Sequence, residues 1–278
     1  MPNTPSRLAQ RLPAIAMLAA VMAISGCQKE TEPTTPNQPT DTQRSDTETT
    51  DNQANTTSVD ANADAPTDMQ VNDAPITILA LGDSLTEGLG VDKDDNYPAQ
   101  LEDRLQAMGY KNTEVVNSGL SGETSTGLVN RLDWVLQTKP DVTILTIGAN
   151  DAIRGIDVAT IEANIRTAVK RLQDNGSVVI LGGMSIYDNL GDDYVAAFSD
   201  IYPRVAKDMN VPLIPFFLEG VGGDAALNQA DAIHPTKEGY TIIVNDNILP
   251  ILEPTLQEVT AAETSQADTT KNTTNEST

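Results

Sequence analysis

The sequence predicts an α/β fold, in which a five-stranded parallel sheet is covered by helices on both faces. Two observations lead to this prediction. Short apolar runs that do not alternate with polar residues recur along the chain, as is typical of strands buried on both faces. Segments with apolar residues at helical spacing separate these runs, and this alternation of strand and helix is the pattern of a parallel sheet.

The apolar runs give the positions of the strands. We expect them at Ile76–Leu81, Glu114–Asn117, Val142–Ile147, Val178–Leu181 and Val211–Ile214. A helix is expected at Val158–Gln173, where the apolar residues fall on one face: Ile161, Ile165, Ala168, Val169 and Leu172. Ligands bind at the carboxyl ends of the strands in such sheets. The residues after each strand are therefore candidates for a functional site.

The folded region is shorter than the chain of 278 residues. Residues 28–75 contain no Leu, Ile, Phe, Tyr or Trp, and the segment after Pro254 is almost as polar. Neither segment buries enough apolar surface to offset the entropy of ordering. The sequence therefore predicts one domain at residues 75–254, a disordered tether rich in Thr, Asp and Pro at 27–74, and a disordered polar tail at 255–278.

Charge and composition exclude several classes of protein. The net charge of −23 would repel a phosphate backbone, so we expect no nucleic-acid partner. The single cysteine and single histidine, Cys27 and His234, cannot form a disulfide framework or supply the ligands of a usual zinc site. The glycines match neither the dinucleotide fingerprint nor the P-loop. We therefore expect no metal and no cofactor.

The first residues are typical of a secretory signal peptide, which we predict at 1–26. Arg7 and Arg11 precede an apolar run at Leu12–Ile24, and this run is too short to span a membrane. The alternative is a buried N-terminal helix. It is disfavoured because the polar segment that follows gives such a helix nothing to pack on.

The end of this segment, Ile24-Ser25-Gly26-Cys27, resembles the bacterial lipobox. The resemblance implies cleavage before Cys27, acylation of its thiol, and attachment to a membrane through this lipid anchor. It also implies an exported protein of the cell envelope. The outer membrane is favoured because Gln28 stands where inner-membrane lipoproteins commonly carry Asp. As a flexible coil, the tether after Cys27 would span about 35–40 Å.

A serine follows the first predicted strand directly, in the segment Gly82-Asp83-Ser84-Leu85. Where a strand ends and a helix begins, a serine hydroxyl is exposed at the sheet edge, and the backbone N–H groups favour an anion. Ser84 is therefore a candidate for the functional site. The alternative is that it only caps the helix.

Two further segments follow the second and third strands. The second strand ends in Asn117–Ser125, where Gly119 and Gly122 allow the backbone to approach a substrate and present an N–H group. The third ends in Gly148-Ala149-Asn150-Asp151, where Asn150 can donate a side-chain N–H to the same edge. In both segments a simple turn or helix cap is the alternative.

The fourth segment, Asp231-Ala232-Ile233-His234-Pro235, contains the only histidine of the chain. Two intervening residues let the Asp231 carboxylate accept a hydrogen bond from His234 Nδ1. This leaves Nε2 free to take a proton from a hydroxyl. The alternative is a histidine at the start of a helix, with Pro235 as its first residue.

Together these four segments resemble the GDSL or SGNH hydrolase family over nearly the whole predicted domain. They occur in the family's order, and each lies at an expected strand end or loop. The late segments Ile201–Pro203 and Val211–Phe217 make the bacterial thioesterase, protease and lysophospholipase group, which is arylesterase-like, the nearest likeness. The resemblance implies a flavodoxin-like three-layer α/β/α sandwich.

The same resemblance implies a role for each candidate residue. Ser84 would be the nucleophile, His234 the general base and then the general acid, and Asp231 the carboxylate that orients the imidazole. The oxyanion hole would consist of the backbone N–H groups of Ser84 and Gly122 and the side chain of Asn150.

One segment, between Gly182 and Ala196, departs from the family pattern. The related bacterial enzymes carry an Arg-Leu-Pro-containing segment followed by basic residues, whereas this chain has Met184–Asp188 and then Asp192 and Asp193. In the family this region borders the acyl site. The family's preferences for acyl length and head group therefore do not transfer to this chain.

The expected function is that of a serine esterase that hydrolyses carboxylic esters, or thioesters, of short to medium acyl chains. A small-molecule ester is the expected substrate, and no obligate protein partner is expected. One alternative is a carbohydrate O-deacetylase of the same fold. The other is a non-catalytic surface lipoprotein that binds a ligand at the same edge of the sheet.

Overall fold

Five parallel strands form a single sheet in the order β2-β1-β3-β4-β5. The computed structural model describes residues 74–186 and 190–275, with side chains up to residue 262. The strands are β1 (Ile76–Gly82), β2 (Thr113–Gly119), β3 (Val142–Thr146), β4 (Val178–Gly182) and β5 (Leu213–Ile214). All five predicted strands are confirmed, and β5 is shorter than expected.

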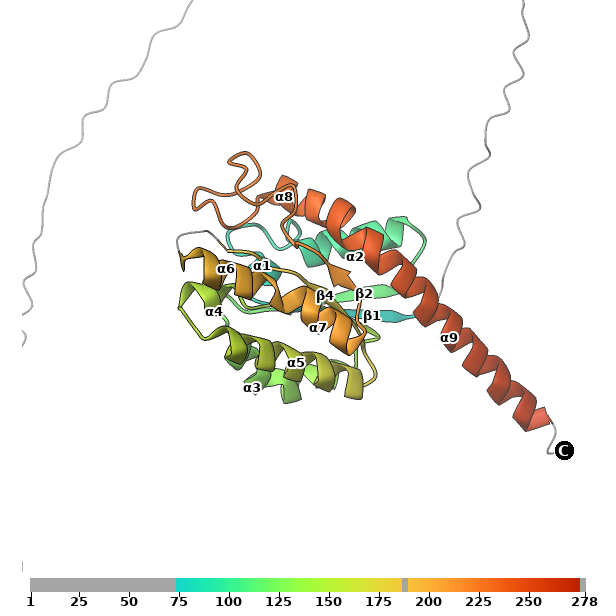
Figure 1. The fold of residues 1–278 in the computed structure, drawn as a ribbon. Coiled ribbons are helices and arrows are strands. Elements are labelled where there is room, and N and C mark those ends of the chain that lie inside the picture. Colours follow the sequence, from blue (N-terminus) through green and yellow to red (C-terminus); the bar gives the residue numbers. More distant parts are fainter. Residues whose placement is uncertain (1–73, 187–189, 276–278) are drawn as a thin grey trace, which may run out of the picture. The chain divides into compact units, whose positions relative to one another are not determined.

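Helices cover both faces of the sheet, and this confirms the three-layer α/β/α prediction (Figure 1). On one side lie α3 (Ser125–Val135), α5 (Val158–Asp174) and α7 (Ile201–Met209), and on the other α2 (Tyr97–Ala107), α8 (Lys237–Ile242) and α9 (Leu249–Asn275). Shorter helices are α1 (Ser84–Glu87), α4 (Ala149–Ile153) and α6 (Asp192–Ser199). A 3₁₀ turn at Leu136–Thr138 and a π-helical turn at Ile243–Ile248 complete the described elements.

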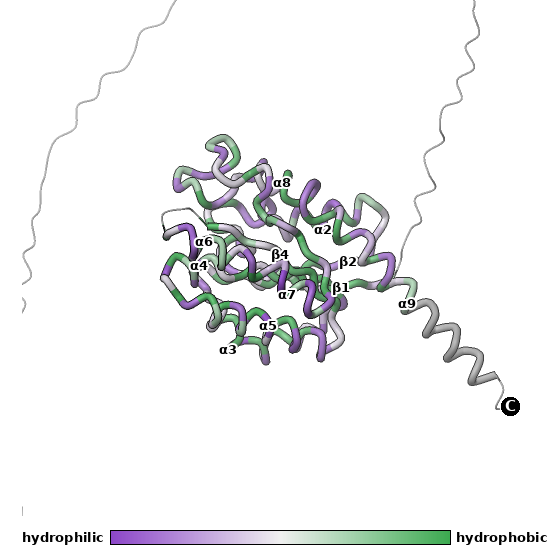
Figure 2. The backbone as a smooth tube through the Cα atoms, in the orientation of Figure 1, coloured by the Kyte–Doolittle hydropathy of each residue, from purple (hydrophilic) through white to green (hydrophobic). Residues whose placement is uncertain are grey.

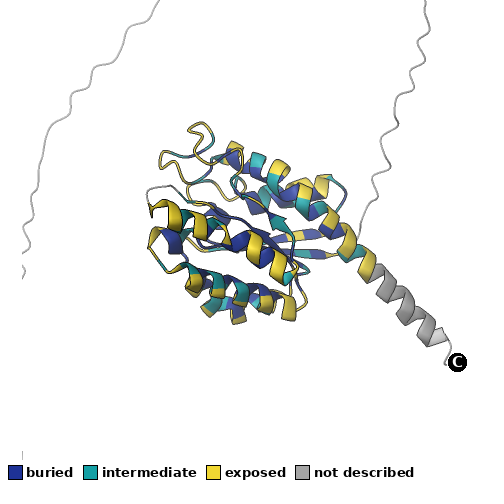
Figure 3. Ribbon diagram, in the orientation of Figure 1, coloured by how far each residue is buried: buried dark blue, intermediate teal, exposed yellow. Residues whose placement is uncertain are grey.

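The core lies between the sheet and these helices. Every residue of β3 is buried, because helices pack on both of its faces. Figure 3 shows the sheet as mostly buried, and Figure 2 shows apolar residues concentrated there. The apolar face predicted for α5 is confirmed, since Ile161, Ile165, Ala168, Val169 and Leu172 are all buried against the core.

The strand order determines where a site can form. The chain runs outward from β1 to β2, returns to β3 on the other side of β1, and then continues outward through β4 and β5. In this flavodoxin-like order the ligand site lies beyond the carboxyl ends of β1 and β3, where the winding direction reverses. Ser84 follows β1 and Asn150 follows β3, so both lie at this switch point.

The prediction of a disordered tail from residue 255 is wrong. α9 continues through Pro254, and its residues Thr255 and Leu256 are buried against the domain. The apolar residues Ile248, Leu252 and Leu256 recur every four positions, so one face of the helix stays in the core across the proline. The polar composition of the last residues obscured this spacing, and the domain extends beyond residue 254.

The predicted signal peptide at 1–26, the predicted acylation site Cys27 and the predicted tether up to residue 73 lie outside the described residues. Within the part of the chain that the structure describes, no helix combines the length and the apolar character needed to cross a bilayer. The predicted lipid anchor is therefore addressed below as a proposal.

Candidate active site

Ser84 is the first residue of α1. The N-cap of this helix is Asp83, whose Oδ1 accepts a hydrogen bond of 3.1 Å from the backbone N–H of Leu85. The alternative that Ser84 only caps the helix is therefore wrong. The N–H groups of Thr86 and Glu87 donate to the Asp83 carbonyl, whereas the Ser84 N–H has no acceptor among the described residues. It is available to a ligand.

Two glycines let the turn that carries Ser84 pack directly on the sheet. A Cβ at Gly82 would lie 2.4 Å from the carbonyl oxygen of Thr146, and one at Gly119 would lie 2.0 Å from the backbone nitrogen of Glu87. Both distances are far shorter than a van der Waals contact, so only glycine fits at these strand ends. The close packing fixes the position of α1.

The structure brings Ser84, His234 and Asp231 together. His234 Nε2 lies 2.9 Å from Ser84 Oγ, and His234 Nδ1 lies 2.7 Å from Asp231 Oδ2. Both are hydrogen-bond distances, although Ser84 and His234 are 150 positions apart in the chain. A hydroxyl, an imidazole and a carboxylate in this order can activate a serine for nucleophilic attack.

A tight turn positions the imidazole. Asp231 Oδ1 accepts hydrogen bonds of 3.0 Å from the backbone N–H groups of both Ile233 and His234. Ala232, which lies between Asp231 and Ile233, adopts a φ of 59°, which is uncommon for a residue with a Cβ. The backbone N–H of Gln229 donates to the His234 carbonyl at 2.8 Å. The loop is thus fixed on both sides of the imidazole.

The alternative for His234, a residue at the start of a helix, is wrong. α8 begins at Lys237, and the Thr236 side chain caps it by accepting from the Gly239 N–H. Pro235 pairs with Asn228 in an antiparallel bridge instead of opening the helix. His234 therefore lies on a loop.

Hydrogen bonds from the His234 side chain, and then from backbone N–H groups, lower the pKa of Asp231 to about 2. The carboxylate is therefore ionised throughout the pH range near neutrality. Because its folded pKa lies below the ordinary value of 3.8, the stability that it contributes is present above pH 4 and is lost as the pH falls toward 2.

The two other candidate donors lie on neighbouring segments. Asn150 is in the first turn of α4, and its Nδ2 donates to Asp83 Oδ2 at 3.3 Å. Gly122 follows β2 with a φ of 74°, a conformation that favours glycine. The Gly122 N–H, like that of Ser84, has no acceptor among the described residues. These three candidate donors thus lie on the segments that follow β1, β2 and β3.

Sequence reasoning missed the side chains that hold these donors in place. The buried Asp151 carboxylate accepts from the Ser125 N–H at 2.7 Å and from the Ser125 hydroxyl at 2.6 Å. Arg154 donates to the Gly122 carbonyl at 2.9 Å. These bonds tie α4, which carries Asn150, to the loop that carries Gly122.

A second set of contacts holds the same loop to the sheet. The buried Glu123 carboxylate accepts two hydrogen bonds from Arg131, at 2.7 and 2.6 Å. The same guanidinium donates to the hydroxyl and the carbonyl of Ser118 at 2.7 and 2.8 Å. The paired charges are thus fully hydrogen-bonded, as buried ions must be.

Asp83 is a buried carboxyl beside this site. Burial raises its pKa to about 6, although hydrogen bonds from the Leu85 N–H and the Asn150 side chain act in the opposite direction. The folded pKa lies above the ordinary value of 3.8. The contribution of this carboxyl to stability is therefore fully present below about pH 4 and is lost as the pH rises through 6.

We expect Asp83→Asn to raise the free energy of unfolding at pH 8 by about 2–3 kcal/mol, because a shift of two pKa units corresponds to about 2.7 kcal/mol. The gain should vanish at pH 4, where the wild-type carboxyl is largely protonated. Denaturant unfolding of both proteins at the two pH values measures the difference. Asp231→Asn is the control, because the pKa of Asp231 is lowered, and it should give no gain at pH 8. An equal change at both pH values would contradict the prediction.

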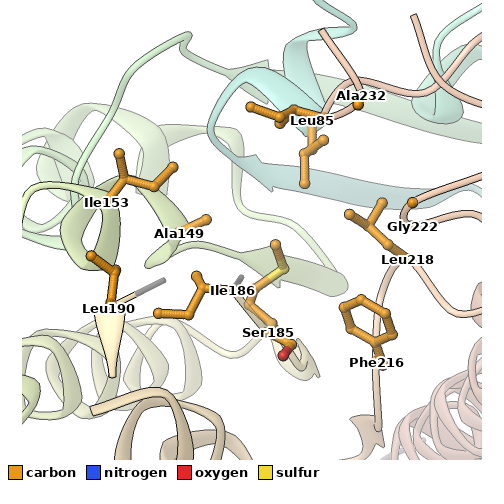
Figure 4. Close-up of a pocket in the computed structure, with 13 residues that line it drawn as sticks. Leu85, Ala149, Ile153, Ser185, Ile186, Leu190, Phe216, Leu218, Gly222 and Ala232 are labelled. Atoms are coloured by element: carbon orange, nitrogen blue, oxygen red, sulfur yellow. The ribbon is translucent and has the colours of Figure 1, made fainter. Parts of the chain in front are cut away.

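An apolar cavity of about 460 Å³ lies beside the three side chains. Leu85, Ala149 and Ile233, which line it, are chain neighbours of Ser84, Asn150 and His234. Figure 4 shows Ile153 and Leu190 on one side of the cavity, with Phe216 and Leu218 facing them. The remaining lining residues are Met184, Ser185, Ile186, Gly222, Gly223 and Ala232. A cavity of this size and character is typical of a small-molecule site.

The segment that departs from the family pattern contributes to this cavity. Met184, Ser185 and Ile186 line it, whereas Tyr187 and Asp188 lie outside the described residues. Asp192 and Asp193 form the first turn of α6. Across the described residues, no cluster of His, Cys, Asp or Glu could hold a metal ion.

A flavodoxin-like sheet with a serine, histidine and aspartate site at its switch point defines a class of hydrolases. The model of the GDSL-like lipase/acylhydrolase family matches residues 80–242. The chain is 38% identical over 181 residues to esterase TesA of Pseudomonas aeruginosa, covering 65% of this chain and 89% of that protein. It is 35% identical over 170 residues to thioesterase 1/protease 1/lysophospholipase L1 of Escherichia coli (strain K12), covering 61% of this chain and 80% of that protein.

The solved structures agree. The crystal structure of AlinE4, an SGNH-hydrolase family esterase, superposes with a TM-score of 0.55 at 35% identity, covering 66% of this chain and 98% of that one. The chain belongs to the GDSL-like lipase/acylhydrolase family, and it is a hydrolase that acts on ester bonds. The family resemblance seen in the sequence is thereby confirmed.

Proposed function

We propose that this chain is a serine esterase that hydrolyses carboxylic esters of short to medium acyl chains. The hydrogen-bonded series Ser84, His234 and Asp231, next to an apolar cavity, carries the proposal. The imidazole is within reach of the hydroxyl proton, as a general base must be. The names of the relatives, which include an arylesterase of Vibrio mimicus, support the same chemistry.

The reaction proceeds through an acyl-enzyme. Ser84 Oγ bonds to the ester carbonyl carbon while His234 Nε2 accepts the hydroxyl proton. The C–O bond to the alcohol then breaks, and the imidazolium gives its proton to the leaving oxygen. A water molecule, deprotonated by the same imidazole, attacks the acyl-enzyme and releases the acid and Ser84. Asp231 orients the imidazole and stabilises its positive charge.

Three donors hold the negative charge that develops on the carbonyl oxygen. They are the Ser84 N–H, the Gly122 N–H and one N–H of the Asn150 side chain. Asn150 retains a second N–H after donating to Asp83, because its amide carries two. The buried Asp83 therefore orients Asn150 and leaves one donor for the substrate.

Hydrolysis of p-nitrophenyl esters from acetate to palmitate, together with labelling by a fluorophosphonate, tests the proposed function. We expect labelling at Ser84 and the highest kcat/KM between butyrate and octanoate, because the cavity is apolar and of limited volume. Release of acetate from acetylated glycans without cleavage of longer esters would favour the carbohydrate deacetylase. Neither labelling nor hydrolysis of any ester would favour a binding protein.

Narrowing the cavity should shift the preference toward shorter esters. We expect Ile186→Trp to raise the ratio of kcat/KM for butyrate over octanoate about tenfold, since one misplaced methylene in an apolar pocket is worth about 1–3 kcal/mol. The same ester series measures the ratio. Val178→Trp, at an exposed position where β4 begins, is the control and should leave the ratio unchanged. A shift toward longer esters would contradict the assignment of this cavity to the acyl chain.

We also propose that Cys27 is acylated and anchors the protein to the outer membrane. The charged start, the apolar run and the Ile24–Cys27 segment support this proposal. Cys27→Ala should release the protein from the membrane fraction and abolish incorporation of labelled fatty acid. A wild-type protein that carries no fatty acid would overturn it.

A further inference from the structure

The side chain of Gln229 joins the two segments that carry Ser84 and His234. Its amide nitrogen donates two hydrogen bonds, at 2.7 Å to the Leu89 carbonyl and at 3.1 Å to the Pro235 carbonyl. Leu89 lies shortly after Ser84 in the chain, and Pro235 directly follows His234. One half-buried side chain therefore bridges the turn after the serine and the loop of the imidazole, although Leu89 and Gln229 are 140 positions apart.

Backbone hydrogen bonds extend this bridge to the catalytic residues themselves. The Gln229 N–H donates to the His234 carbonyl at 2.8 Å. At the other end, the Leu89 N–H donates to the Ser84 carbonyl at 3.1 Å. A continuous series of hydrogen bonds thus connects the serine and the histidine through Leu89 and Gln229. Together with the contact of 2.9 Å between Ser84 Oγ and His234 Nε2, this series closes a ring.

The backbone next to Leu89 leaves space for the Gln229 amide. A Cβ at Gly90 would lie 2.0 Å from Gln229 Oε1 and 2.8 Å from Gln229 Cδ, and both distances are far shorter than a van der Waals contact. Gly90 also adopts a φ of 83°, a conformation that favours glycine. A larger residue at this position would therefore push the amide away from its two carbonyl acceptors.

Proton transfer depends on how the two segments are held. It needs Ser84 Oγ and His234 Nε2 at hydrogen-bond distance, and a displacement of about 1 Å can cost about 10²-fold in rate. Deeper in the fold, the Tyr240 hydroxyl donates to the Leu85 carbonyl at 2.9 Å. That bond joins α8 to α1, whereas the Gln229 amide acts on the loop of His234 itself.

We propose that Gln229 is a positioning residue, whose amide sets the distance between the Ser84 hydroxyl and the His234 imidazole. This inference rests on the proposed function, because it concerns the same proton transfer. The amide contacts backbone carbonyls and not the reacting atoms. Its loss slows acylation and deacylation together, since His234 serves both steps, and it leaves the binding of the ester intact.

Gln100 on α2 provides a matched control. Its amide nitrogen also donates to two backbone carbonyls, at 2.7 Å to Asp95 and at 3.1 Å to Lys237. These bonds join the start of α2 to the start of α8 and do not involve the segments of Ser84 and His234. Methionine is similar to glutamine in length but has no N–H donor, so replacement by Met removes the same pair of bonds at either position.

We expect Gln229→Met to lower kcat for p-nitrophenyl butyrate about 10- to 100-fold at nearly unchanged KM, whereas Gln100→Met should keep both constants within about twofold. Denaturant unfolding should show similar losses of stability in the two variants, because each loses two hydrogen bonds of the same kind. An unchanged kcat in Gln229→Met would overturn the proposal, since Tyr240 would then suffice to hold the loop. Equal losses of kcat in the two variants, or a loss confined to KM, would also overturn it.

Gly90→Ala reaches the same amide from the other segment and leaves Gln229 in the chain. We expect it to lower kcat about tenfold alone, and no further when it is added to Gln229→Met, because the amide bonds are already lost there. Gly176→Ala controls for backbone strain, since Gly176 has a φ of 97° and an added Cβ would meet nothing within 4 Å. Additive losses, or equal losses in the two glycine variants, would contradict the proposal. The glycine pair also tests it if Gln229→Met does not fold.

A readout without turnover separates this inference from the proposed function. His234, the single histidine of the chain, gives one imidazole signal in NMR spectra. Ser84→Ala should shift this signal in the wild type and shift it much less in Gln229→Met, where the hydroxyl is no longer held at hydrogen-bond distance. Equal shifts in the two backgrounds would overturn the positioning role. If the wild type hydrolyses no ester but the shifts differ, the proposed function fails while the positioning role stands.

Discussion

Replacing Ser84 by Ala is expected to lower kcat for p-nitrophenyl butyrate by at least about 10⁴-fold, because no other group can form the acyl-enzyme. Ser185→Ala is the matched control. Ser185 lines the same cavity, but no imidazole approaches its hydroxyl among the described residues, so its loss should leave kcat nearly unchanged. Initial rates at saturating ester, with protein concentration from absorbance, measure both effects. A Ser84→Ala variant that retains a tenth of the wild-type rate would remove Ser84 from the mechanism.

The same reasoning predicts how a second substitution combines with the first. His234→Ala should cost about as much as Ser84→Ala, and the double variant should lose no more than either alone, because the two groups act as a unit. Additive losses would mean that His234 acts elsewhere in the reaction. The single histidine of the chain makes this comparison unambiguous.

The sheet was predictable from the sequence because its strands are buried on both faces. Such strands consist of continuous Val, Ile and Leu residues, as β3 illustrates, and helices of clear periodicity separate them. The short helices α1 and α4 have too few residues to show a period. Backbone hydrogen bonds define them in the structure, from the Gly88 N–H to the Ser84 carbonyl and from the Ala152 N–H to the Gly148 carbonyl.

The C-terminal helix shows where composition misled the prediction. Thr and other polar residues dominate the segment after Pro254, and this composition suggested an end to the fold. Leu256 nevertheless continues the spacing of Leu252 and is fully buried, and Val259 also packs against the core. Burial of one face decides whether a helix continues, and mean polarity does not measure it.

At the site, the sequence indicated the groups that would touch substrate but not those that hold them. The position of Asp151 could have marked it as a supporting residue, because it follows Asn150 directly after a predicted strand. Nothing in the sequence marked Arg131 or Arg154, because both resemble ordinary surface cations. The partner of Arg131 is the Glu123 carboxylate, eight residues away, and the partner of Arg154 is the Gly122 carbonyl, 32 residues away. Neither pairing follows from the residue types, and both form only in the fold.

Asn150→Ala is expected to lower kcat by about 10²–10³-fold while KM changes little, because the lost N–H acts on the charge that develops in the transition state. Steady-state kinetics with p-nitrophenyl butyrate separate the two constants. Asn175→Ala, at the C-cap of α5 and away from the site, is the control and should change neither. A rise in KM at unchanged kcat would instead show that Asn150 binds the substrate equally well in the ground state and in the transition state.

Asp83→Asn should lower kcat less than Asn150→Ala does. It should also give the gain in stability at pH 8 predicted above. Asp83 Oδ2 now accepts from Asn150, whereas an amide nitrogen in its place would oppose the Asn150 donor and let that side chain rotate. Both effects arise from one cause, since the buried charge that destabilises the fold also orients an oxyanion donor. A gain in stability together with a loss of activity is expected where a destabilising buried charge serves catalysis. A variant that is both more stable and fully active would show that Asp83 is not needed to orient Asn150.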